Sequence, residues 1–194
     1  MKVKLLTAAI VSATALLASC SSPSISYQDP NAVNNLTTNF TQNDLRTVAQ
    51  DMSNELIQSG KMNRCKSFTI SPVKNATDQY VDTSVMTNAM ADTLTNSSAV
   101  NATYVVSTQE MTNQSDELNR QSDAGMYDQS TAAKKGHMRG AQCRIDGKLT
   151  NDTSVGPDGK TTLVSYTFFV QMYDVQQGAA VWRNSKSISK IKKY

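Results

Sequence analysis

The first regular pattern of apolar and polar positions begins at Thr41. Thr41 and Asp44 form a Thr-x-x-Asp capping pair, and apolar residues then recur every three or four positions until Gly60. These apolar residues are Leu45, Val48, Met52 and Leu56. The spacing predicts an amphipathic helix with one buried face, and Gly60 is a suitable end for it.

Helical spacing returns three times further along the chain. Residues 82–97 repeat apolar side chains at Val85 or Met86, Ala89 or Met90, and Leu94. Residues 108–121 favour a mostly polar helix. Residues from about 129 to 140 favour a last helix that Gly136 interrupts and Gly140 ends.

Alternation at period two predicts the strands. Residues 66–73 place Phe68 and Ile70 on one face and stop at Pro72, and shorter strands are expected at 104–107 and 142–150. The strongest alternation lies within residues 163–175, with one face formed by Val164, Tyr166, Phe168, Val170 and Met172. Gly178 permits a tight reversal into a last strand that carries Val181 and Trp182.

The order of these elements is α-β-α-β-α-α-β-β-β. Helices alternate with strands first, and a strand pair joined by a tight turn comes last. This order predicts an α/β fold in a single domain, with a mixed β-sheet flanked by helices and a C-terminal β-hairpin.

The N-terminus has the three-part plan of an export signal. Lys2 and Lys4 precede an apolar core that ends at Leu17, which is shorter than the roughly 20 apolar residues of a membrane-spanning helix. The residues Leu17-Ala18-Ser19-Cys20 resemble the bacterial lipobox. That resemblance implies cleavage between Ser19 and Cys20, a diacylglyceryl group and acyl chains such as palmitate on Cys20, and, because serine follows Cys20, an outer-membrane address.

These boundaries predict three segments: a lipoprotein signal peptide over 1–19, a lipidated N-terminus and flexible tether over 20–40, and a periplasmic domain over 41–194. The tether is polar and lacks periodicity. Fully extended, some 20 residues reach roughly 65 Å at most.

Export also affects how the other two cysteines are interpreted. Cys65 and Cys143 remain once Cys20 is acylated, and each precedes a strand-like run. If those strands are parallel neighbours, the two sulfurs can bond in an oxidising compartment. A disulfide and two buried thiols both remain open.

Charge and composition exclude nucleic acid as a partner. The formal charge is +3, but Lys2 and Lys4 belong to the signal, and the chain without them is close to neutral. The remaining basic bias lies in residues 183–194, for which the sequence favours a solvated tail over a contact with an anionic partner.

The sequence shows no catalytic or metal-binding pattern. His137, the only histidine, lies in a basic segment without a nucleophile motif. Asp152, Asp158 and Gly159 lack the spacing of a calcium loop, and 156–160 is better explained as a turn. We therefore expect that the protein is not an enzyme and that it binds no cofactor or metal. Trp182 lies at the end of an apolar strand, and we expect it to lie in the core.

Residues 140–149, "GAQCRIDGKL", followed by 168–182, "FFVQMYDVQQGAAVW", resemble the C-terminal half of the LpoB family of outer-membrane lipoproteins. The matching positions are Gly140, Ala141, Gly147, Leu149, Asp174, Gly178, Val181 and Trp182. Upstream segments extend the resemblance to about 41–187. It implies a lipid-anchored protein that binds and stimulates a bifunctional penicillin-binding protein, and so contributes to peptidoglycan synthesis and cell shape.

The sequence does not identify the partner-binding face, although the basic segment 132–139 and the loop 151–160 are candidates. Two other classes remain open. One is a secretion-associated lipoprotein of the curli-export kind that assembles into rings, and the other is a structural envelope lipoprotein that binds glycan or another lipoprotein.

Overall fold

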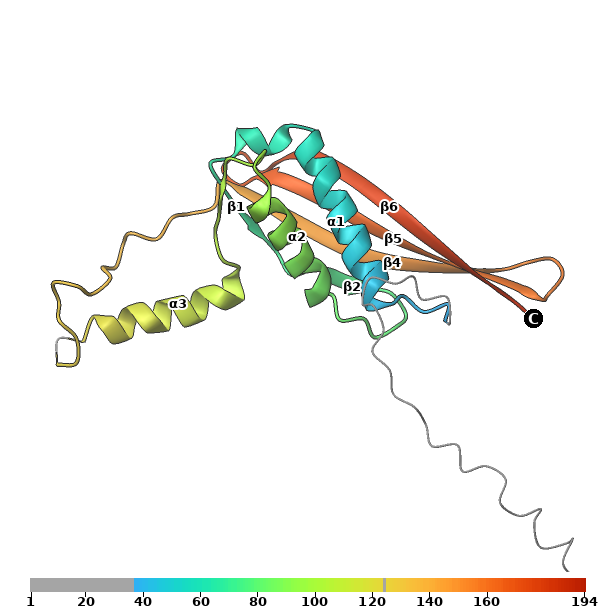
Figure 1. Cartoon of the computed structure of the whole chain (residues 1–194), viewed down its shortest axis with the longest axis horizontal. Helices are drawn as coiled ribbons and strands as arrows, with labels where there is room; N and C mark the ends of the chain where they lie inside the picture. Colours follow the sequence, from blue (N-terminus) through green and yellow to red (C-terminus); the bar gives the residue numbers. More distant parts are fainter. Residues whose placement is uncertain (1–36, 124) are drawn as a thin grey trace, which may run out of the picture. The chain divides into compact units, whose positions relative to one another are not determined.

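The computed structural model describes residues 37–123 and 125–194, which belong to one compact unit (Figure 1). The helices are α1 (Gln42–Gln58), α2 (Ser84–Asn96) and α3 (Thr108–Gln121), with a short 3₁₀ helix η1 (Lys61–Arg64). The strands are β1 (Ser67–Ile70), β2 (Lys74–Ala76), β3 (Thr103–Tyr104), β4 (Cys143–Val155), β5 (Thr161–Asp174) and β6 (Ala179–Lys193).

All six strands form one sheet of mixed direction. The order is β3-β1-β4-β5-β6, and β2 also pairs with β4. The β1 strand runs parallel to β3 and β4, whereas β4, β5 and β6 form an antiparallel meander. The predicted α/β fold with a mixed sheet and a C-terminal hairpin is therefore confirmed.

The core lies between the sheet and the helices α1 and α2, which cover the same face (Figure 1). Helix α1 has a capping box at Thr41 and Asp44, and it buries the apolar stripe that the sequence predicts. From β5 the buried face is the predicted set Val164, Tyr166, Phe168, Val170 and Met172. No described side chain of α3 is buried.

Gly147 has no side chain because the core leaves no space for one. It lies on the buried face of β4, where an added Cβ would lie 2.8 Å from Cγ2 of Val73 and 3.0 Å from the ring of Phe168. Those two side chains fill the volume above the strand, which explains why a glycine stands between the buried residues Ile145 and Leu149.

The helix predicted over 129–140 is wrong. This segment has turns and irregular backbone, most of its side chains are exposed, and Gly136 has a φ of 85°. The segment has no apolar face to bury, and a short helix without one gains too little from its own hydrogen bonds to form.

The prediction of a solvated tail over 183–194 is also wrong, because β6 continues to Lys193. Its register follows β5 along almost its full length, with one irregularity at Met172 and Tyr173. Similarly, β4 continues to Val155, beyond the predicted end. Pairing between neighbouring strands satisfies the backbone of these polar segments, although their sequence contains no strong alternation.

Candidate functional site

Ser19 and Cys20, the predicted cleavage and lipidation sites, lie outside the described residues. Within the part of the chain that the structure describes, no helix has the length and apolar character needed to cross a membrane.

Cys65 and Cys143 are joined by a disulfide in the structure, with their Cα atoms 5.9 Å apart. Cys65 follows η1, and Cys143 begins β4 beside Phe68 of the parallel strand β1. The two cysteines are 2% and 3% exposed. A bond that is so well buried holds the start of the sheet together and is poorly placed for exchange with external thiols.

The other residues that the sequence singles out for chemistry do not form one site. His137 is exposed in the irregular segment, and Trp182 packs half-buried against the core. Hydrogen bonds from the Lys160 N–H, the Thr161 hydroxyl and the Thr161 N–H hold the pKa of Asp158 below its usual value, and they form the β4–β5 turn. Among the described residues, no three His, Cys, Asp or Glu side chains are grouped so as to hold a metal ion.

On the sheet face opposite α1 and α2, charged and aromatic side chains lie next to one another. On this face Arg144 lies beside Tyr173, and Lys148 lies beside Phe169. A hollow of about 620 Å³ lies over these strands. We call its charged, amide and aromatic lining the cationic face, which consists of Lys74, Arg144, Asp146, Lys148, Phe169, Gln171, Tyr173 and Arg183.

One corner of the cationic face is held in place by its own contacts. Nε of Arg144 donates to Oδ1 of Asp146 at 3.0 Å, and Nη2 donates to Oδ2 at 2.9 Å. The guanidinium also lies over the ring of Tyr173, at 5.4 Å from the centroid, and the Tyr173 hydroxyl donates to Gln171. These contacts restrain the guanidinium and the phenol ring.

The cationic face is not apparent from the core pattern of β5. The apolar alternation marks the buried positions of this strand, and Phe169 and Tyr173 occupy the other alternate positions. The available signal was two aromatic residues on the nominally polar face of a strand. The pattern of one strand could not identify Lys74 and Arg183. These residues come from β2 and β6, which lie beside β4 and β5 only in the folded sheet.

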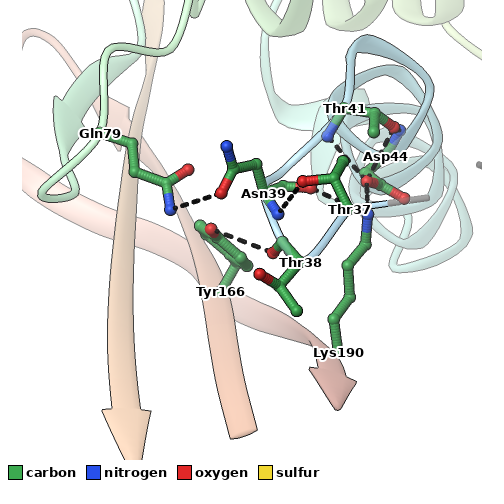
Figure 2. Close-up of polar contacts among 8 residues, drawn as sticks. All are labelled: Thr37, Thr38, Asn39, Thr41, Asp44, Gln79, Tyr166 and Lys190. Atoms are coloured by element: carbon green, nitrogen blue, oxygen red, sulfur yellow. Dashed lines mark hydrogen bonds and ion pairs between the residues drawn. The ribbon is translucent and has the colours of Figure 1, made fainter. Parts of the chain in front are cut away.

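A second polar cluster fixes the beginning of α1 to the end of β6 (Figure 2). Oδ2 of Asp44 accepts hydrogen bonds from the N–H of Thr41 at 2.8 Å and from Nζ of Lys190 at 2.6 Å. Lys190 also donates to the carbonyl of Asn39 at 3.0 Å. Phe40 stacks on Tyr166, with ring centroids 4.5 Å apart. The residues that lead into α1 are therefore attached to β5 and β6.

Asp44 gives this cluster a pH dependence. Burial acts to raise the pKa of its carboxyl group, but hydrogen bonds from Lys190 and Thr41 and the charge of Lys190 outweigh burial, so the pKa lies below its ordinary value. Ionised Asp44 thus stabilises the folded state above the ordinary pKa of aspartate, and this contribution is lost as the pH falls through the lower pKa of the folded state.

We expect Asp44→Asn to remove part of the acid sensitivity of the protein. The free energy of unfolding of the wild type should fall between about pH 5 and pH 3, and that of the variant should fall less over this range. Chemical denaturation at several pH values measures the difference. Asp116→Asn, at an exposed position of α3, is the control, and equal pH dependence in all three proteins would contradict the role of Asp44.

The fold and its sites define an α/β domain with an open, charged and aromatic sheet face. The family model described as "Peptidoglycan-synthase activator LpoB" matches residues 44–188. The chain belongs to this family, as its resemblance in sequence predicts.

Solved structures with similarity to this chain include two LpoB C-terminal domains. The Salmonella enterica domain is 16% identical to this chain, with a TM-score of 0.44. The alignment covers 75% of this chain and 98% of that domain. The Escherichia coli domain is 13% identical with the same coverage and TM-score. The lipoprotein GNA1162 from Neisseria meningitidis is 14% identical, covers 64% of this chain and 82% of its own, and has a TM-score of 0.39. A search of curated proteins finds no match.

Proposed function

We propose that this protein binds and stimulates a bifunctional peptidoglycan synthase, a penicillin-binding protein, from the periplasmic side of the outer membrane. The observation that carries this proposal is the match of residues 44–188 to the family of peptidoglycan-synthase activators. The protein acts by contact and not by catalysis. It binds the active conformation of the synthase more tightly than the inactive one, and this difference in affinity increases the active population.

A polymerisation assay tests this function. The full chain, purified in detergent, is added to the purified bifunctional synthase from the same bacterium, and the rate of glycan-strand formation from the lipid-linked precursor is followed. We expect the rate to rise with the concentration of the chain and then to saturate. An unrelated outer-membrane lipoprotein at the same concentration is the control, and an unchanged rate would overturn the proposal.

The anchor forms part of the same proposal. Acyl chains on Cys20 hold the mature chain to the outer membrane, because several chains on one residue give stable binding where a single chain gives only marginal binding. Residues 20–40 then connect the lipid to the domain. We expect Cys20→Ala to abolish acylation, measured by mass spectrometry, and to remove the protein from the outer-membrane fraction. Retention of the variant in that fraction would contradict a lipid anchor at Cys20.

A further inference from the structure

The cationic face contains positive charges that the protein itself does not neutralise. Arg144 is paired with Asp146, but none of the ion pairs formed by the described residues includes Lys74, Lys148 or Arg183. All three of these side chains are exposed. The hollow therefore has an excess of positive charge on a chain that is close to neutral without its signal segment.

The register of the sheet pairs none of these three basic residues with an acidic side chain. Lys74 of β2 stands directly beside Lys148 of β4, and Arg183 of β6 stands beside Gln171, which carries no charge. The two ammonium groups carry like charges at neighbouring positions of parallel strands and therefore repel each other. A partner that carries negative charge would relieve this repulsion, so the arrangement fits an acidic partner.

The centre of the same surface is aromatic. Phe169 and Tyr173 lie half-buried on β5, with Lys148 and Arg144 beside them on β4. Among the described residues, no core residue covers their outer side, because α1 and α2 pack on the opposite face (Figure 1). Aromatic and arginine side chains are the residues enriched at the centres of protein interfaces.

We propose that the cationic face is the surface that contacts the synthase, and that its occupant is an acidic patch of that enzyme. Aspartate or glutamate carboxylates of the patch bind Lys74, Lys148 and Arg183, and an apolar side chain covers Phe169 and Tyr173. This inference rests on the proposed function. A second copy of this chain fits poorly, because a two-fold interface would bring the same positive charges face to face.

The test measures binding of the full chain to the purified synthase at low and moderate salt. The variant combines Lys148→Glu and Arg183→Glu. The control combines Lys134→Glu and Lys135→Glu, which makes the same change of charge in the exposed irregular segment. We expect the variant to bind at least about tenfold more weakly and with less dependence on salt, and the control to bind like the wild type. Circular dichroism checks that all three proteins are folded.

A further variant, Phe169→Ala, tests the aromatic centre. It should weaken binding to the synthase and leave the salt dependence of the wild type unchanged, because it removes contact area and no charge. Sedimentation of each protein with purified sacculi runs in parallel.

Several results would overturn the inference. Binding of the Lys148→Glu, Arg183→Glu variant at wild-type strength would show that the synthase docks elsewhere, while the proposed function stands. Loss of binding in the control would move the contact to residues 132–139. The wild type could also co-sediment with sacculi while the charge-reversal variant does not, with equal binding of both to the synthase. That result would make the ligand the carboxylates of peptidoglycan. If the wild type itself does not bind the synthase, the proposed function is wrong, and this inference is wrong with it.

Discussion

Replacing both Cys65 and Cys143 with alanine should lower the melting temperature of the protein by about 8–16 °C. The bond joins residues 78 positions apart. Closing a loop of that length restricts the unfolded chain and stabilises the folded state by roughly 4 kcal/mol, and each kcal/mol shifts the melting temperature of a protein of this size by about 2–4 °C. Thermal unfolding of the full chain in detergent, followed by circular dichroism, measures the shift.

Two controls separate the bond from the side chains. Intact-mass measurement before and after reduction shows whether the wild type carries the disulfide, and the reduced wild type should melt close to the alanine variant. Because both sulfurs are buried, alanine also removes some packing, which the reduced wild type retains. A reduced protein that melts at the temperature of the oxidised one would show that the bond contributes nothing to stability.

Replacing Phe168 with alanine should cost about 3–5 kcal/mol of unfolding free energy. The side chain is 0% exposed, and its ring fills the space above Gly147 in the middle of the sheet. Truncation removes its apolar contacts and leaves a cavity between the sheet and the helices. The close-packed side chains around this cavity can move into it only in part. Urea denaturation measures the loss, with an unchanged m-value as the sign that only stability differs.

Phe169→Ala is the matched control for Phe168→Ala. The two residues are neighbours on β5 with the same side chain, but Phe169 faces the open side of the sheet and is only half-buried. We expect it to cost less than about 1.5 kcal/mol, because less apolar area returns to water. Equal losses for the two variants would contradict the assignment of the two faces.

The local patterns predicted most of the fold because local interactions determine those elements. The capping pair Thr41 and Asp44 and the spacing of Leu45 and Val48 are properties of neighbouring residues, and α1 forms where they indicate. The period-two alternation around Tyr166 and Phe168 likewise identifies the buried face of β5. Both signals arise from burial of one face of an element, which sequence periodicity records directly.

The predictions that were wrong concern segments without such periodicity. The polar half of β6 forms because β5 supplies hydrogen-bond partners along its length, and two of its lysines, Lys186 and Lys190, bind Asp51 and Asp44 of α1. Composition alone made this segment resemble a solvated tail. The prediction for 129–140 was wrong in the opposite sense, because this segment has no apolar face whose burial would stabilise a helix.

The sequence by itself determined most of the helices and strands, the core stripes, the family of the protein and the residues proposed for export and anchoring. Those features depend on a residue and its near neighbours or on a motif that is contiguous in the chain. The sequence did not predict β2, and the helix that it predicted over 129–140 does not form. The cationic face, the cluster that attaches Lys190 to Asp44 and the contact between Cys65 and Cys143 were decided only by the tertiary structure. Each of them joins residues that lie far apart in sequence, and their proximity depends on strand order and register, which local patterns do not encode.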